Sequence, residues 1–220
     1  MLQVGDETLR GFLNARPGEA LNLSAREISA FDALHGAGPE TALPRLRQML
    51  LDRFQAYKWS GLAGIAPYAR SGDATDIAEE LRKATNAATV LHKYMPALQQ
   101  TLLDYPRVTV TGLRQAFRWM HYNIDGTTTL ALMHELAASY GAARAVAQRQ
   151  YYVSTGYNSE QAVAGFLPVQ GGTLVAYTNH TFTDQVSGFG GGVKRSIGRR
   201  MMASKLTQIF QTGRGRLGQQ

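Results

Sequence analysis

Residues 173–211, TLVAYTNHTFTDQVSGFGGGVKRSIGRRMMASKLTQIFQ, set the organisation of the chain. The first part, 173–183, is rich in Val, Thr, Tyr and Phe, which is typical of a β-strand. Glycines at 188 and 190–192 then form a hinge. Residues 193–211 place apolar and basic side chains on opposite sides of a helix. This stretch predicts a closing strand followed by a long amphipathic helix that covers the sheet.

The composition is that of a basic globular protein. The chain has 220 residues, a net charge of +7 and no cysteine. A chain of this length can bury a core, and its charge favours acidic partners such as an anionic membrane surface or an acidic protein. The lack of cysteine excludes a disulfide framework, a thiolate metal site and a cysteine nucleophile.

The compartment is left open by the sequence. No apolar run approaches the ~20 residues that span a bilayer, and the start, MLQVGDETLR, lacks the features of a secretory signal. If a signal peptide was removed, the periplasm or cell envelope is favoured; otherwise the protein is expected in the cytoplasm.

The first 106 residues are predicted to be mainly helical. Apolar residues at helical spacing and helix-capping signals place the expected helices at residues 6–15, 24–35, 40–59, 76–94 and 96–103. Ser24 and Glu27 have the spacing of a capping box. Residues 61–70, with two glycines and a proline, predict a loop.

A β-hairpin is predicted around Asp125-Gly126, a dipeptide that favours two-residue turns. If the turn is of type I′, Ile124 pairs with Thr127. Three further cross-strand pairs follow on one mostly apolar face of the sheet: Phe117 with His134, Trp119 with Leu132, and His121 with Leu130.

Beyond this hairpin, a turn near residue 140 leads into a strand at 143–154. A two-residue and a three-residue loop both fit. The choice decides whether Arg149 and Tyr151, or Gln148 and Tyr152, point at the apolar face. Residues 159–166 are predicted as a short helix, because Ser159 can cap it and acidic or amide side chains follow in its first turn.

These elements predict one α+β domain over residues 1–220. A mainly helical part at 1–106 precedes an antiparallel sheet of four or more strands with the C-terminal helix packed on it, at 107–212. Residues 213–220 are expected to form a tail.

Residues 113–211 resemble the START-like, or helix-grip, superfamily of ligand-binding proteins. The likeness rests on GGTLVAYTN at 171–179, followed by the glycine linker and the basic amphipathic helix. Residues 178–202 also resemble segments of uncharacterised bacterial proteins. The START-like resemblance implies an apolar cavity between helix and sheet, and therefore non-enzymatic binding of an apolar small molecule or lipid.

The predicted ligand-binding residues lie on the apolar sheet face, the closing strand and the C-terminal helix: Phe117, Trp119, His121, Leu130, Leu132, His134, Tyr177 and Met201. The basic side of that helix offers an anion-binding surface of Lys194, Arg195, Arg199 and Arg200. An interaction or accessory protein of the bacterial envelope, acting through this surface, is an alternative function. Nucleic acid is not expected, since no nucleic-acid-binding motif is present.

A hydrolase or cyclase is a further alternative, with His121, His134, His180 and Asp184 as candidate catalytic residues. His121 and His134 should stand more than about 10 Å apart along the hairpin, too far to share a metal ion. Asp184 could orient His180, but no third catalytic member is marked. The sequence therefore predicts no metal and no cofactor, and favours a binding protein over an enzyme.

Overall fold

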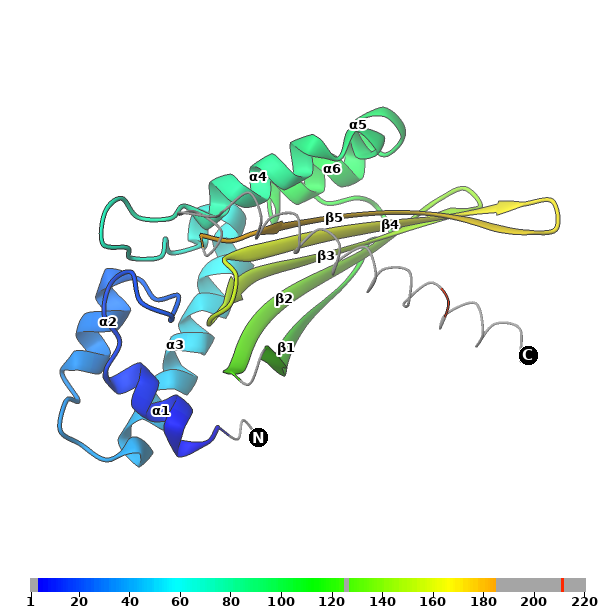
Figure 1. The fold of residues 1–220 in the computed structure, drawn as a ribbon. Coiled ribbons are helices and arrows are strands. Elements are labelled where there is room, and N and C mark those ends of the chain that lie inside the picture. The colour runs from blue at the N-terminus through cyan, green and yellow to red at the C-terminus, as the bar shows by residue number, and fades with distance from the viewer. Residues whose placement is uncertain (1–3, 125–126, 185–210, 212–220) are drawn as a thin grey trace, which may run out of the picture. The chain divides into compact units, whose positions relative to one another are not determined.

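The structure, a computed structural model, describes residues 4–124, 127–184 and 211. The chain divides into a compact unit of Met1–Phe182 and a second unit of Thr183–Gln220, and the fold below is that of the first. The helix predicted at 193–211, its glycine hinge and the tail at 213–220 lie outside the described residues, apart from Gln211. The α+β class is confirmed, because the described residues form six α-helices and a five-stranded antiparallel sheet (Figure 1).

The N-terminal half is helical, as predicted. Its elements are α1 (Asp6–Leu13), α2 (Ala25–Asp32), α3 (Pro39–Ser60), the 3-10 helix η1 (Gly61–Gly64), α4 (Ile77–Ala87), α5 (Thr89–Tyr94) and α6 (Pro96–Asp104). The capping box is confirmed: the Ser24 hydroxyl accepts from the Glu27 amide, and the Glu27 carboxylate accepts from the Ser24 amide. The single helix expected at 76–94 is two helices, because Ala88 leaves the helical conformation with φ −77° and ψ 71°.

The sheet is a simple antiparallel meander with the strand order β1-β2-β3-β4-β5. The strands are β1 (Arg114–Ile124), β2 (Thr127–Tyr140), β3 (Ala143–Val153), β4 (Ser159–Val169) and β5 (Gly172–Phe182). The predicted register of the first hairpin is confirmed, including the pairs of Phe117 with His134 and of Ile124 with Thr127. The turn at 125–126 lies outside the described residues.

The short helix expected at 159–166 is wrong, because these residues belong to β4. Ser159 and the acidic and amide residues after it imitate a helix start. The backbone instead pairs with β3 on one side and with β5 on the other. Two full sets of interstrand hydrogen bonds outweigh a weak local preference.

A β-bulge decides which side chains of β3 point at the apolar face, a choice that the sequence left open. Tyr140 pairs with Ala143 across a two-residue turn, which places Arg149 opposite His134. The register then shifts, and Leu132 pairs with Tyr152. Arg149 and Tyr152 therefore share a face, a combination that neither loop length alone produces.

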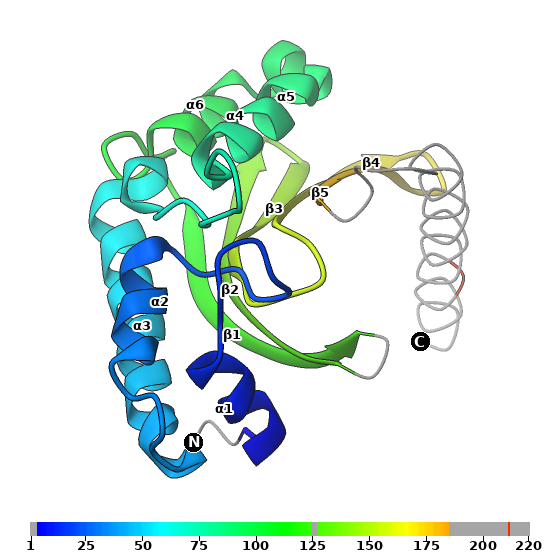
Figure 2. The ribbon, with the colours of Figure 1, turned by 60° about the vertical axis from the view of Figure 1, so that its left-hand side comes forward.

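The helices pack on one face of the sheet, called here the helical face (Figures 1 and 2). The main core joins α1, α2 and α3 to β2 and β3, with Tyr57, Leu132 and Tyr152 among its buried residues. A second core joins α5 and α6 to β2, β3 and β4, and includes Leu98 and Val163.

Candidate functional site

The side chains predicted to form a cavity wall are separated by the fold. Leu130 and Leu132 are buried in the main core, and Phe117 packs against α3 beside them. On the edge strand β1, Trp119 is 52% exposed and His121 is also exposed. Outside the described residues lie Met201, Lys194, Arg195, Arg199 and Arg200.

His134 is held in the core as a neutral side chain. Its Nδ1 lies 3.1 Å from the Tyr57 hydroxyl and its Nε2 lies 3.0 Å from Gln115 Oε1. Burial, with the Arg149 charge as a second cause, lowers the pKa of His134 to about 3. The imidazole is therefore uncharged at neutral pH and has both nitrogens occupied, which suits packing rather than proton transfer.

The fold does not bring the three candidate histidines together. His134 and His180 lie in one cross-strand row that passes through Arg149 and Gln161. Three strand spacings of about 4.8 Å place them roughly 14 Å apart. His121 lies on the outer strand β1. Within residues 4–124 and 127–184, no three His, Asp or Glu side chains are grouped so that they could hold a metal ion.

A buried arginine lies on the helical face beside His134. Arg149 is 1% exposed and donates from Nε and Nη2 to Gln161 Oε1, at 2.9 and 2.6 Å. Its Nη2 also donates to Thr85 Oγ1 at 3.2 Å. Burial raises the pKa of the Tyr57 hydroxyl, and the charge and hydrogen bonding of Arg149 partly offset this rise. Its partners in the described chain are thus neutral groups, and this network links α3, α4, β3 and β4.

On the opposite face, tyrosines bridge β1 to β3. Tyr122 donates to Gln150 Oε1 at 3.1 Å and also contacts the hydroxyl of Tyr157, which donates to the same Gln150 oxygen at 2.6 Å. Since β2 lies between β1 and β3, the Tyr122 side chain must lie across β2. This position explains why Thr129 and Ala131 of β2 are buried on that face.

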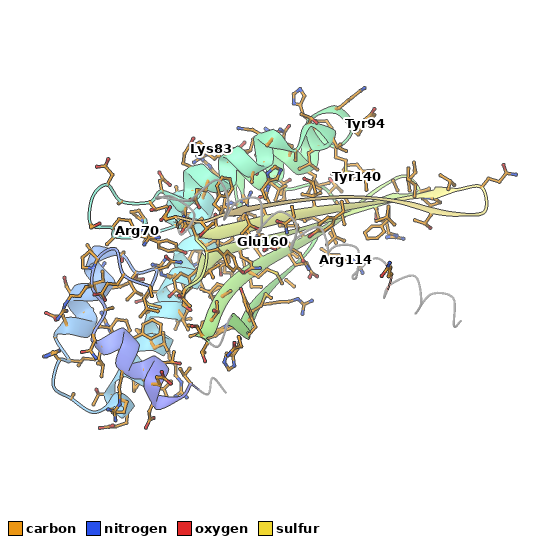
Figure 3. The ribbon with its side chains drawn as sticks, viewed as in Figure 1. Arg70, Lys83, Tyr94, Arg114, Tyr140 and Glu160 are labelled. Carbon is orange, nitrogen blue, oxygen red and sulfur yellow. The ribbon has the colours of Figure 1, made fainter. Side chains whose placement is uncertain are left out.

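Glu160 lies on the same face of β4 (Figure 3). Burial raises the pKa of its carboxyl, while hydrogen bonds from Asn179 and Thr181 oppose the rise. Thr181 in turn donates to Asn179 Oδ1 at 3.0 Å. The polar groups around Glu160 thus bind one another, and the cluster braces β4 and β5.

An apolar groove of about 610 Å³ lies between α5 and the far ends of β3, β4 and β5. The helical side and the segments beside it contribute Ala88, Val90, Leu91, Tyr94 and Met95. The sheet contributes Tyr140, Ala143, Val163, Gly165, Phe166, Leu167, Leu174, Ala176, Tyr177 and Thr178. Among the described wall residues that the sequence predicted, Tyr177 lines this groove.

Small residues on the sheet leave room for the groove. Gly165 carries no side chain, and a Cβ placed there would meet Met95 Cε at 3.8 Å. The break between α4 and α5 lets α5 lie over this point. Tyr140 faces the groove from the end of β2 and Tyr94 from α5 (Figure 3). The Tyr140 hydroxyl is buried beside the Leu98 backbone and makes no hydrogen bond of good geometry with the described residues.

A second hollow, of about 420 Å³, lies beside Glu27 and Arg53, between α2 and α3. Arg53 Nε and Nη2 donate to the two Glu27 carboxylate oxygens at 2.7 and 2.6 Å. The guanidinium also lies 4.3 Å from the centroid of the Tyr152 ring. Because the two charges satisfy each other, this hollow has less to offer a ligand than the apolar groove.

Two errors hid the groove from sequence reasoning: the helix assigned to 159–166 and the unbroken helix assigned to 76–94. The available signal was FLPV at 166–169, an apolar run close to a Gly-Gly turn.

Comparison with known protein families, with curated proteins and with solved structures found no match to this chain. In the described part, no helix is long and apolar enough to cross a membrane. The geometry of the groove is therefore the basis for assigning a function.

Proposed function

We propose that the protein binds an apolar or lipid-like ligand in the groove between α5 and strands β3, β4 and β5. The observation that supports the proposal is a hollow of about 610 Å³ with a mainly aliphatic and aromatic lining. This volume is typical of small-molecule sites. Removing apolar ligand surface from water supplies roughly 25 cal/mol per Å² before the costs of association are subtracted.

The ligand class is the one that the START-like resemblance implies. That resemblance places the ligand between the sheet and the C-terminal helix, whereas the helix over the proposed groove is α5. Four side chains in the lining carry a hydroxyl group: Tyr94, Tyr140, Tyr177 and Thr178. A buried hydroxyl without a good partner costs about 1–3 kcal/mol. A ligand with one small polar group could relieve this cost at Tyr140. We therefore expect an amphiphile such as a fatty acid or a long-chain alcohol.

The substitution Gly165→Val tests the groove directly. A branched side chain at this position would fill the floor next to Met95. Titration with a fluorescent fatty acid, whose emission rises in apolar surroundings, should show saturable binding to the native protein. Affinity should fall at least about tenfold in Gly165→Val, because the groove loses apolar contact area.

The matched control is Gly172→Val on the same hairpin. Gly172 does not line the groove, and a Cβ at this position would have no atom within 4 Å. The control should bind the probe as the native protein does. Equal binding by both variants, or no saturable binding by the native protein, would refute the proposed function. Circular dichroism of all three proteins shows whether the fold is retained.

A further inference from the structure

The β4–β5 hairpin extends past its neighbours (Figure 1). The pairing of β3 with β4 ends at Phe166, opposite Arg144, whereas β4 and β5 stay paired as far as Val169 and Gly172. Residues 167–174 form this projecting end, called here the arm. Three residues per strand reach about 10 Å beyond β3.

The arm presents apolar side chains to solvent. Leu167, Val169 and Leu174 are 46%, 48% and 58% exposed. No Asp, Glu, Lys or Arg occurs anywhere in residues 161–183. A two-stranded ribbon is marginally stable alone, and contiguous exposed apolar side chains mark an interaction site.

The base of the arm is aromatic and basic. Tyr94 and Tyr177 are 63% and 38% exposed and line the groove beside the arm. The Lys93 ammonium lies 5.1 Å from the centroid of the Tyr94 ring, and exposed Arg144 is paired with Phe166. Residues 81–103 and 136–159, which include α5 and the β2–β3 turn, contain no acidic residue.

We propose that the arm inserts into the surface of an anionic phospholipid membrane. The apolar tip of the arm would reach the acyl chains, the tyrosines would lie at the membrane interface, and the cations would meet the anionic headgroups. The order of these side chains along the protein therefore matches the order of the layers in a bilayer. The reach of about 10 Å matches the depth at which interfacial elements are buried. The net charge of +7 adds attraction at longer range. The uncharged tip favours a membrane over an acidic protein.

Membrane docking rests on the exposed apolar side chains of the arm and on the cations beside it, and it needs no ligand in the groove. Since Leu167 and Leu174 also line the groove, each proposal is judged with its own probe: vesicles for docking and the fatty acid for the groove. Flotation of the full chain with vesicles tests it. The native protein should float with vesicles of phosphatidylcholine and phosphatidylglycerol at low salt. Binding should be at least about tenfold weaker with phosphatidylcholine alone or at high salt, since two or more cations contribute.

Two variants assign the binding to the arm and to the cations at its base. Leu174→Asp should weaken binding at least about tenfold, because the membrane loses a leucine that it would bury and a charge must be desolvated instead. Lys93→Glu with Arg144→Glu should weaken binding by a similar factor on the anionic vesicles. The matched control is Leu51→Asp on α3, where an apolar side chain is 39% exposed, and it should bind as the native protein does.

A tryptophan reports insertion even if the aspartate variant folds poorly. The chain has two tryptophans, Trp59 and Trp119, which can be replaced by phenylalanine before Leu174→Trp is introduced. With vesicles, its emission should shift to the blue and be quenched by brominated acyl chains. No shift and no quenching would overturn the proposal. Failure of the native protein to float would also overturn it. If Leu174→Asp then dissociates an oligomer, the arm contacts a second copy of the chain instead.

Discussion

The Tyr57 hydroxyl on α3 lies 3.1 Å from Nδ1 of His134 on β2, a contact between residues 77 positions apart. The Tyr57 ring also stacks on Tyr151, with ring centroids 4.0 Å apart. Burial raises the pKa of Tyr57, so its hydroxyl stays protonated and donates to Nδ1. His134 then carries its proton on Nε2 and donates to Gln115 Oε1. This chain of hydrogen bonds fixes α3 on the sheet.

The stability of the protein should therefore depend on pH through His134. Its pKa is lowered from 6.5 to about 3 on folding, so the unfolded chain binds a proton at a higher pH than the folded chain does. The stability that neutral His134 contributes is fully present above pH 6.5. As the pH drops from 6.5 towards 3, the free energy of unfolding falls by at most about 1.4 kcal/mol per pH unit.

Urea unfolding across this pH window measures the effect. His134→Gln, which cannot be protonated, should be less stable than the native protein at neutral pH but should lose less stability on acidification. Parallel losses in the two proteins would show that other groups control the acid response. Glu160 opposes the effect, because a carboxyl whose pKa is raised by burial favours the folded state at lower pH.

The contribution of Arg149 to stability should depend on its neutral hydrogen-bond partners. Arg149→Met removes a buried charge together with the two shortest hydrogen bonds that Gln161 Oε1 accepts, and leaves this oxygen only the longer one from Thr85 Oγ1 at 3.3 Å. The change should lower the free energy of unfolding by about 1–3 kcal/mol. The double variant Arg149→Met with Gln161→Leu should recover part of this loss. The measurement is a double-mutant cycle by urea unfolding. A single Arg149→Met variant more stable than the native protein would show that the hydrogen bonds do not offset the cost of burying the guanidinium.

Glu27 should contribute more to the free energy of unfolding than a helix cap alone does, because it accepts hydrogen bonds both in the α2 capping box and from Arg53. The Glu27 and Arg53 side chains are 15% and 6% exposed. Glu27→Gln should cost about 3 kcal/mol or more, since it leaves the Arg53 charge unpaired. Ser24→Ala removes the hydroxyl cap but keeps the ion pair, and should cost about 1 kcal/mol. Similar thermal shifts in the two variants would contradict this ranking.

Local signals predicted the first hairpin, because Asp125-Gly126 and the alternation on both sides of it specify one register. They could not predict β4, whose pairing depends on strands before and after it in the chain. The β-bulge at Tyr151 places Arg149 and Tyr152 on one face of β3. Each of the two loop lengths that fit the sequence predicts only one of these two positions. The groove depends on both β4 and the break at Ala88, so it follows from tertiary packing rather than from a motif.

Gly61 should tolerate no side chain. It ends α3 with φ +58°, and a Cβ there would lie 1.7 Å from the carbonyl oxygen of Tyr105, a backbone atom that cannot turn aside. Gly61→Ala should therefore cost about 3 kcal/mol or more, measured by urea unfolding. The matched control is Gly36→Ala, with φ +84° and no atom within 4 Å of its Cβ position, which should cost only about 1 kcal/mol. Because Tyr105 also stacks on Tyr57, Gly61→Ala should change the near-ultraviolet circular dichroism as well. Equal losses of stability in the two variants would show that Tyr105 moves away at little cost.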